Sequence, residues 1–390
     1  MSDSLQDVRL ALVAGEASGD LIAAASLEGL VARGLGLEGI GGPRLKALGM
    51  NCWAPAEALA VRGYVEALSR LPALLAIRRQ LLARLRASPP KVFMGVDAPD
   101  FNLGVERQLR AMGVTTVHFI SPTIWAWRPE RLHAIAQSVD HLFCLFPFEP
   151  ELYRGTRVQA EFVGHPLADR IAFNPDRKVA QEQLGLDRRL PVLAVLPGSR
   201  RSEIQWIGPA FLQASAMLAR DWQVIIPAAS PQVAQQIQAL PDWQAARDAG
   251  VRLLVPDESV LSDAAPLSHQ ALAAADLVLV ASGTATLEAA LVGRPMVIGY
   301  RVPPLTHWLM RRKAQVAHVG LPNLLLGRSL VTECLQAQCE STSLVSALRG
   351  LSEDAARQEE MRSAFEALHA TLRQSATTRV GERLSELLVA

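Results

Sequence analysis

The sequence lacks most of the features of a secreted, metal-binding or nucleic-acid-binding protein. Only four cysteines occur among the 390 residues, and no two of them form a CxxC pair. Neither zinc binding nor a disulfide framework is therefore expected, and a reduced, cytosolic protein is the default. The formal net charge of +1 argues against a protein that holds nucleic acid through bulk positive charge.

Long hydrophobic runs are also missing. No stretch approaches the ~18–20 uninterrupted apolar residues that a membrane-spanning helix needs. Aromatic residues make up only 5% of the chain, whereas apolar residues make up 50%, so a large and mainly aliphatic core is possible. The length predicts two or three domains of about 100–200 residues each.

A strand–loop–helix pattern occurs twice in the chain. A buried strand at 8–14 leads into the small-residue loop 15–20 and then a helix at 21–33. The same order returns with a strand at 192–196 and a loop at 197–200. Doubly wound parallel sheets begin in this way, so two such sheets are predicted in tandem. The loop 15–20 is not GxGxxG and does not indicate a nicotinamide or flavin cofactor.

The stretch 281–288 is a candidate phosphate-binding turn. It follows the apolar strand 276–280 and leads into a helix rich in Ala and Leu. Backbone N–H groups at a helix start suit a phosphate, and Ser282, Thr284 and Thr286 add hydroxyl groups. Glu288 lies one turn into the helix, where a carboxylate suits a ribose diol. An ordinary capped turn is the alternative.

A second phosphate-type loop is predicted at 197–201. Gly198 and Ser199 offer backbone donors, and Arg200 or Arg201 is placed to neutralise a diphosphate. A solvent-exposed arginine pair is the alternative. No DxD triplet occurs in the chain, so a diphosphate held by a metal ion is disfavoured. Its charge would instead be balanced by helix dipoles and arginine.

Asp97 is the candidate general base. The strand 92–96 runs directly into Asp97 and Asp100, and residues just past the C-terminal end of a parallel strand face the ligand crevice. Asp100 fits the role of a helix cap better, which leaves Asp97 for proton transfer.

Aromatic and histidine side chains follow two later strands of the first half. Trp125, Trp127 and Arg128 come after the strand 114–120, where they either shape a pocket or pack at a domain seam. His165 either lines the crevice or is a structural histidine.

The segment 59–86 interleaves apolar residues with arginines. The apolar positions are Val61, Val65, Leu68, Leu71, Leu74 and Leu75, and Arg78 is one of six arginines among or just beyond them. Basic residues beside an apolar surface are typical of an interfacial membrane helix. A pair of helices with the apolar face in the core is the alternative.

Several of these stretches together resemble the lipid-A-disaccharide synthase family. They are 15–20, 95–102, 121–128, 196–200, 281–288 and 321–325, in that order along residues 10 to 340. The resemblance implies a GT-B fold, with two doubly wound Rossmann-like domains facing a central cleft and a helical C-terminal tail. The expected ranges are 1–168 for the acceptor and membrane side, 169–340 for the UDP donor, and 341–390 for helices that pack back or are exchanged between protomers.

The same resemblance implies an inverting glycosyltransferase. Its donor would be UDP-2,3-diacylglucosamine, its acceptor 2,3-diacylglucosamine 1-phosphate (lipid X), and the new bond β(1→6). No cofactor or metal and no nucleic acid is expected. The enzyme would be cytoplasmic and peripherally associated with the inner membrane of a Gram-negative cell through the segment 59–86, and the tail makes a homodimer plausible.

The resemblance also distributes site residues between two substrates. Catalysis is assigned to Asp97 and Arg200. The predicted donor site comprises Gly198, Ser199, Arg201, Ser282, Gly283, Thr284, Ala285, Thr286, Glu288, Tyr300 and Asn323. The predicted acceptor side of the cleft comprises Glu16, Ser18, Gly19, Asp100, Asn102, Ser121, Trp125, Trp127, Arg128 and His165.

Other functions remain open at this point. A UDP-GlcNAc 2-epimerase or a murein transferase would share the fold, and a non-catalytic nucleotide-sugar binding protein would share the donor site. The epimerase needs no lipid contact, and the murein enzyme usually carries a GGxGGH-type loop where this chain has Gly15–Asp20.

Overall fold

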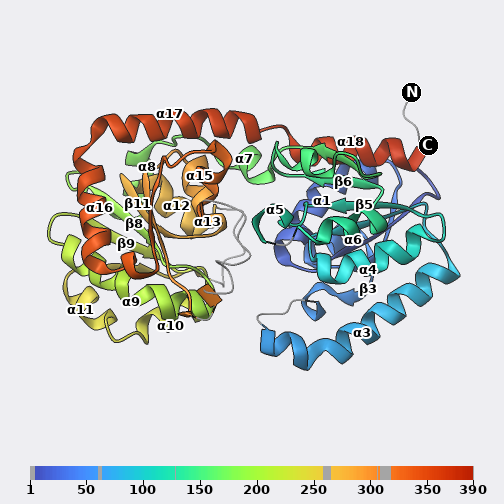
Figure 1. Ribbon diagram of the computed structural model, residues 1–390, viewed down its shortest axis with the longest axis horizontal. Coiled ribbons are helices and arrows are strands. Elements are labelled where there is room, and N and C mark those ends of the chain that lie inside the picture. The colour runs from blue at the N-terminus through green and yellow to red at the C-terminus, as the bar shows by residue number, and fades with distance from the viewer. Residues whose placement is uncertain are drawn as a thin grey trace. The chain divides into compact units, whose positions relative to one another are not determined.

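The computed structural model describes residues 5–59, 64–127, 129–257, 265–304, 306–307 and 318–389. The chain forms two compact units (Figure 1). The first comprises Met1–Asp169 with Leu372–Ala390, and the second comprises Arg170–Thr371. Each unit is built on a parallel sheet with helices around it, and the chain ends in helices. The predicted fold class of two parallel-sheet α/β domains with a helical C-terminal end is confirmed.

The sheet of the first unit has the strand order β3-β2-β1-β4-β5-β6-β7, and all its pairs are parallel. The strands are β1 (Arg9–Ala14), β2 (Gly36–Gly41), β3 (Asn51–Pro55), β4 (Val92–Val96), β5 (Thr115–Phe119), β6 (His141–Cys144) and β7 (Gln159–Phe162). The sequence pattern misses β2 and β3. β2 contains three glycines and β3 has no β-branched residue, so neither shows the usual composition of a strand.

Helices cover both faces of this sheet because its inner strands are apolar on both sides. Leu10 and Leu12 of β1 pack with α1 (Ala17–Val31), whereas Ala11 and Val13 pack with α3 (Tyr64–Ala87) and α4 (Pro99–Arg110). The remaining helical segments of the unit are η1 (Ala56–Ala58), α2 (Pro43–Ala47), α5 (Ile124–Trp127), α6 (Arg131–Ser138), η2 (Glu149–Tyr153), α7 (Pro166–Arg170) and α18 (Ala376–Val389).

The last helix, α18, completes the core of the first unit. Val380, Leu384 and Leu388 recur at intervals of four residues, which places them on one face of the helix. All three are buried in the same cluster as Leu10 and Leu12 of β1. Figure 1 shows α18 in red beside the blue N-terminal elements. Within this chain, α18 therefore belongs to the first unit.

The predicted third segment, 341–390, is divided between the units. Helices α16 (Ser341–Glu353) and α17 (Ala355–Leu372) belong almost entirely to the second unit, and α18 belongs to the first. The boundary between the two sheets follows Asp169, one residue from the predicted position.

The sheet of the second unit has the order β10-β9-β8-β11-β12-β13, again with parallel pairs. Its strands are β8 (Val192–Leu196), β9 (Gln223–Pro227), β10 (Arg252–Leu254), β11 (Leu277–Ala281), β12 (Met296–Tyr300) and β13 (Thr332–Leu335). Its other helices are α8 (Arg177–Gln183), α9 (Arg201–Leu218), α10 (Pro231–Gln238), α11 (Trp243–Asp248), α12 (Leu267–Ala274), α13 (Thr284–Leu291), α15 (Leu321–Leu326) and η3 (Gln336–Gln338).

A GxGxxG string, Gly34–Gly39, lies in the first unit but not in a phosphate loop. It spans the turn after α1 and most of β2, so it leads into a strand. A dinucleotide loop leads from a strand into a helix. The string therefore does not indicate a nicotinamide or flavin site.

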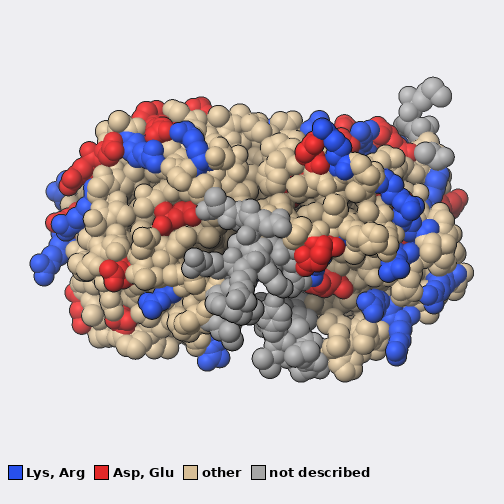
Figure 2. All heavy atoms as spheres, viewed as in Figure 1, with Lys and Arg blue, Asp and Glu red and all other residues tan. Residues whose placement is uncertain are grey.

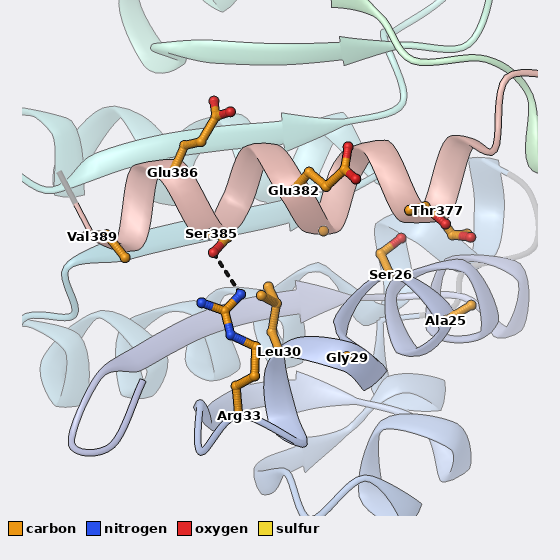
Figure 3. A pocket seen from close by; sticks show the side chains of 12 residues that line it. Ala25, Ser26, Gly29, Leu30, Arg33, Thr377, Glu382, Ser385, Glu386 and Val389 are labelled. Carbon is orange, nitrogen blue, oxygen red and sulfur yellow. Dashed lines mark hydrogen bonds between the residues drawn. The ribbon is translucent and has the colours of Figure 1, made fainter. Parts of the chain in front are cut away.

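The crossing of α18 over α1 depends on a glycine. A Cβ atom at Gly381 would lie 2.7 Å from the backbone oxygen of Ser26, whereas one at Gly29 would meet nothing within 4 Å. Figure 3 shows the groove beside this crossing, where Arg33, in the turn after α1, donates a hydrogen bond of 3.0 Å to Ser385 of α18. None of the residues predicted to form a substrate site lines this groove.

We expect Gly381→Ala to destabilise the first unit because its methyl group must push α18 away from α1. The matched control is Gly29→Ala on α1, which should stabilise the protein by up to about 1 kcal/mol because alanine is the better helix former. Urea unfolding of both variants checks the pair. Equal midpoints would show that the close approach at Gly381 is not required.

Candidate active site

Each sheet has one point at which its strand order reverses. In the first unit this point lies between β1 and β4, and in the second between β8 and β11. Ligands of open α/β sheets bind at such points, beyond the carboxyl ends of the strands. The predicted residues Glu16 and Asp97 follow β1 and β4, and Arg200 and Ser282 follow β8 and β11. Each unit therefore has its own candidate site.

Asp97 follows β4 with an unusual backbone. Its φ is 53° and that of Ala98 is 44°, a left-handed conformation that non-glycine residues seldom adopt. Two such residues in succession store strain, which persists only where the surroundings impose it. The backbone N–H of Asp97 donates to the carbonyl of Phe119 on β5 at 2.9 Å. The Asp97 side chain is half-buried, so a carboxylate is held at the reversal point and stays accessible.

Asp100 does not occupy the cap position of α4, contrary to the helix-cap interpretation. The cap position of α4 is Ala98, and no side chain caps this helix. Asp100 lies in the first turn of α4, is exposed, and forms an ion pair with Arg131 of α6. The interpretation of Asp100 as the cap is therefore wrong. Asp100 still differs from Asp97, because its carboxylate is paired with Arg131.

Asn102 lies beneath the predicted acceptor surface. Its side chain is fully buried, and its amide nitrogen donates to the carbonyl oxygen of Asp97 at 2.8 Å. The same nitrogen lies 3.5 Å from the carbonyl oxygens of Val13 and Val96. A side chain without exposed surface cannot contact a ligand, so the prediction of direct acceptor contact is corrected. Asn102 instead holds the ends of β1 and β4 and the loop that carries Asp97.

The loop after β1 is shorter than predicted. Helix α1 begins at Ala17 and not at Leu21, so Ser18 and Gly19 lie in its first turn. Glu16 and Ser18 are exposed at the reversal point, whereas Gly19 is buried against Val96. Glu16 and Ser18 are therefore accessible to a ligand.

An aromatic group with a buried carboxyl follows β5 and β6. Trp125 is half-buried, makes edge contacts with Phe146 and Phe148, and donates its indole N–H to Glu149 at 3.2 Å. The second Glu149 oxygen accepts from the backbone N–H groups of Leu145 and Phe146, each at 3.0 Å. Burial raises the pKa of Glu149 to about 7, against the lowering effect of these bonds.

Ser121 and His165 face the protein interior. Ser121 is buried and its hydroxyl lies 2.9 Å from that of Tyr153. His165 is buried, its Nδ1 accepts from the backbone of Leu167 at 3.2 Å, and burial lowers its pKa to about 4. The structural alternative for His165 therefore fits its surroundings.

Some predicted residues lie outside the described part of the chain. They are Arg128 and Val61, together with the side chains of Trp127, Val65 and Leu68.

In the second unit, an acidic side chain occupies part of the predicted phosphate loop. Glu203 of α9 accepts from the backbone N–H groups of Ser199 and Arg200 at 3.1 and 3.2 Å. Its other oxygen lies 3.4 Å from the Arg200 guanidinium. The position of Glu203, three residues after the cap residue Arg200, is the spacing of a capping box. Arg200 and Arg201 are exposed, so their side chains remain open to an anion.

Hydrogen bonds connect the loop after β11 to the segment around the start of α15. The Ser282 hydroxyl donates to the carbonyl of Val319 at 2.7 Å, and Thr286 Oγ1 accepts from the N–H of Leu321 at 3.3 Å. Thr286 is fully buried, whereas Gly283 and Thr284 are exposed and Ala285 is half-buried. The exposed start of α13 is thus held in place by hydrogen bonds on its inner side.

The other predicted donor residues divide into accessible and enclosed ones. Glu288 is partly exposed and its Oε2 lies 3.3 Å from Nε2 of His269 on α12. Tyr300 ends β12 next to β11; burial raises its pKa, with Glu203 adding to the effect and Arg200 opposing it. Asn323 is buried and bonds to Val331, Leu330 and Glu333, so it holds backbone rather than facing solvent.

Sequence reasoning missed Glu149, Glu203 and His269. Only Glu203 carries a local signal, its capping-box spacing from Arg200. Glu149 and His269 meet their partners Trp125 and Glu288 through the fold alone. No group of three or more His, Cys, Asp or Glu side chains suited to a metal ion occurs in the described part of the chain.

The chain matches the family model described as lipid-A-disaccharide synthetase over residues 10–384. It is 44% identical over 385 residues to a lipid-A-disaccharide synthase of Chromobacterium violaceum, covering 97% of both chains. It is 45% identical over 387 residues to one of Paraburkholderia phytofirmans, covering 98% of this chain and 96% of the relative.

Similar solved structures are more distant in sequence. UDP-GlcNAc 2-epimerase from Neisseria meningitidis bound to UDP-GlcNAc superposes with a TM-score of 0.62 at 12% identity, over 97% of this chain and 100% of that one. Sucrose-phosphate synthase from Thermosynechococcus elongatus gives 0.59 at 14% identity, over 98% and 99%. At this identity the likeness shows the fold, which is GT-B-like.

The pKa of Glu149 predicts a pH-dependent stability. The ordinary value of 4.5 applies when the protein is unfolded, and about 7 when it is folded. The stabilising contribution is therefore complete below pH 4.5 and is lost as the pH rises through about 7. Relative to Glu149→Gln, the wild-type free energy of unfolding should fall by roughly 3 kcal/mol between pH 5 and 8. Urea unfolding at several pH values checks this, and parallel curves would contradict it.

Proposed function

The chain belongs to the lipid-A-disaccharide synthase family, and on that premise we propose the reaction in detail. The protein is a glycosyltransferase of lipid A biosynthesis. The proposed donor is UDP-2,3-diacylglucosamine and the proposed acceptor is lipid X. The products are UDP and the β(1→6)-linked disaccharide 1-phosphate. The observation that carries the proposal is Asp97, an accessible carboxylate at the reversal point of the first sheet.

In the proposed mechanism the acceptor's 6-hydroxyl attacks the donor's anomeric carbon on the face opposite UDP. Asp97 takes the hydroxyl proton as the new C–O bond forms. The bond from the anomeric carbon to the phosphate oxygen breaks at the same time, and UDP leaves with the electron pair. Inversion at the anomeric carbon follows from attack on the opposite face. The left-handed backbone at 97–98 and the hydrogen bond from Asn102 support a fixed position for the base.

The departing diphosphate needs positive charge, which the second unit supplies without a metal ion in this proposal. Arg200 and Arg201 are exposed beside the loop after β8, and the start of α13 presents exposed backbone at Gly283 and Thr284. Both features stabilise developing negative charge. Glu203 already holds two backbone N–H groups of the first loop, so we assign more of the diphosphate charge to the Arg200 side chain. Glu288 is assigned to the ribose of UDP.

A nucleotide-sugar epimerase and a non-catalytic binding protein are the rival functions. The fold alone does not separate them, because a UDP-GlcNAc 2-epimerase has a similar one. The discriminating assay measures UDP release from UDP-2,3-diacylglucosamine with and without lipid X. Release that depends on lipid X supports the transferase, and release in neither case would contradict it.

We expect Asp97→Asn to abolish kcat while leaving UDP binding unchanged, because UDP is assigned to the other unit. Loss of a general base typically costs about 10²–10⁴-fold. Asp221→Asn is the matched control: the same change on an exposed carboxylate that is paired with Arg349 and belongs to neither predicted substrate site. Steady-state kinetics and UDP titration check both variants. Turnover of Asp97→Asn close to that of the control would exclude Asp97 as the base.

We further propose that α3 contacts the membrane surface through its N-terminal half. None of the described helices is both long and apolar enough to cross a bilayer. The C-terminal half of α3 buries Leu81, Leu82 and Leu85 in the core, as the helix-pair alternative expected. Leu71, however, is 48% exposed, and Leu74 and Leu75 are partly exposed.

Basic side chains accompany this apolar surface. Figure 2 shows Lys and Arg on the face of the first unit that carries the later part of α3. Arg78 and Arg79 lie about one helical turn after Leu75 on α3. Cations beside an apolar surface favour an anionic lipid surface. Peripheral association with the cytoplasmic leaflet of the inner membrane is part of the proposal, and a homodimer through the C-terminal tail stays a prediction.

The triple change Leu71→Ser, Leu74→Ser and Leu75→Ser should release the protein from vesicles that contain anionic phospholipid. Each buried apolar side chain withdrawn from lipid costs about 1.5–3 kcal/mol of binding free energy. Leu190→Ser is the control, since Leu190 is 47% exposed, close to Leu71 at 48%, but lies in the second unit. Co-sedimentation measures the binding. Unchanged sedimentation of the triple variant would return α3 to a purely structural role.

A further inference from the structure

A cluster of buried polar side chains lies directly beneath Asp97. Five buried side-chain nitrogen or oxygen atoms lack a hydrogen-bond partner in the described part of the chain, and three of them are Asn102 Oδ1, Glu106 Oε2 and His118 Nε2. All three residues are fully buried. Unpaired polar atoms cost free energy, so a group of three in one place needs an explanation.

Glu106 and His118 form a buried ion pair between α4 and β5. Glu106 Oε1 lies 2.7 Å from His118 Nδ1, and both side chains are 0% exposed. Burial raises the pKa of Glu106. Burial alone would lower the pKa of His118, but the charge and hydrogen bond of Glu106 outweigh it, and Asp97 adds to the rise. The pair therefore retains a proton, and its histidine is within the electrostatic reach of Asp97.

The backbone next to Asp97 is shaped around this pair. Gly95 lies on β4, two residues before Asp97, and a Cβ atom there would collide with Glu106 Oε1 and with the Asn102 side chain. Only glycine lets the Glu106 carboxylate pass under β4 to reach β5. Asn102, one helical turn before Glu106, holds the Asp97 carbonyl from the same side.

Stability alone does not account for the arrangement. A buried ion pair is commonly no better for stability than well-packed apolar side chains of similar volume, because both charges lose their hydration. Ionisable groups that are buried beside a candidate catalytic group are more often functional. The strain at 97–98 also requires surroundings that impose it.

We propose that Glu106, His118 and Asn102 are positioning residues that hold the Asp97 carboxylate in place for the reaction. The proposal rests on the proposed function, in which Asp97 is the general base. Asn102 fixes the backbone of residue 97. The Glu106–His118 pair places buried charge beside the end of β4, where the Glu106 carboxylate lies against Gly95 and the charge of Asp97 acts on His118.

Other titratable groups on the surrounding elements have their own partners or positions. Asp100 on α4 pairs with Arg131, and Asp20 on α1 accepts from the backbone N–H groups of Gly42, Arg44 and Leu45. Glu16 is exposed at the start of α1. Arg78 of α3 approaches α4 at Gly104, further along that helix.

Glu106→Gln tests the electrostatic part because it keeps the shape and removes the charge. His118 should then become neutral, since burial is no longer opposed, and Asp97 should lose a nearby positive charge. We expect the acid limb of the pH profile of kcat/KM to move to higher pH, and kcat to fall by about 10- to 100-fold, the cost of a misplaced reacting group. The KM for the UDP donor should stay unchanged.

Thr116→Val is the matched control. Thr116 is also fully buried on β5, but its hydroxyl bonds to Ser138 and Asp140 at 2.9 and 3.0 Å, toward the other end of the strand. The Thr116→Val change should lower the free energy of unfolding and leave the acid limb of the pH profile of kcat/KM at its wild-type position. An acid limb of Glu106→Gln that coincides with those of the wild type and Thr116→Val would overturn the proposal.

A second measurement does not need turnover, and the two variants that it compares change only accessible carboxylates. The imidazole ¹⁵N signal of His118, identified by its loss in His118→Gln, should shift toward the neutral form in Asp97→Asn and stay in place in Asp100→Asn. Equal spectra for the two variants would also overturn the proposal. A wild-type protein that fails the UDP-release assay would refute the proposed function, while this comparison would still decide whether Asp97 and His118 are coupled.

Discussion

Parallel strand pairing is the constraint on which both candidate sites depend. All strands of a sheet point the same way, so the residues that follow them gather at one edge, however far apart they lie in the chain. Glu16, Asp97 and Ser121 meet at the edge of the first sheet in this way, and Arg200, Ser282 and Tyr300 at that of the second. The reversal of strand order then leaves room between two neighbouring loops for a ligand.

The two units differ in how they hold their functional groups. In the first, a left-handed backbone and the hydrogen bond from Asn102 hold the loop that carries Asp97, which suits the proposed role of that carboxylate as a base. In the second, Glu203 holds the N–H groups of a phosphate-type loop and two arginines remain exposed. Arginines that stay exposed in this way can bind and release an anion, as the proposed donor site would have to do with UDP.

The sequence predicts the architecture well because its strongest signals are the apolar strands and the small-residue loops after them. Those features place Asp97, Arg200 and the start of α13 correctly at the two reversal points. The sequence predicts less well which buried side chains support these residues. Asn102 follows Asp97 so closely that it looks like a surface residue, yet α4 turns it into the core. The partners of Trp125 and Glu288 come from other elements, and no local spacing predicts Glu149 or His269.

The return of α18 has a consequence for the order in which the protein is made. The first unit needs Val380, Leu384 and Leu388 to close its core, and these residues follow the whole of the second unit in the chain. The second unit has all its residues, Arg170–Thr371, before them. On the ribosome the second unit can therefore finish folding while the first still exposes the surface that α18 will cover. A chain that ends at Thr371, nineteen residues short, would retain every residue of the second unit and leave the first unit without α18.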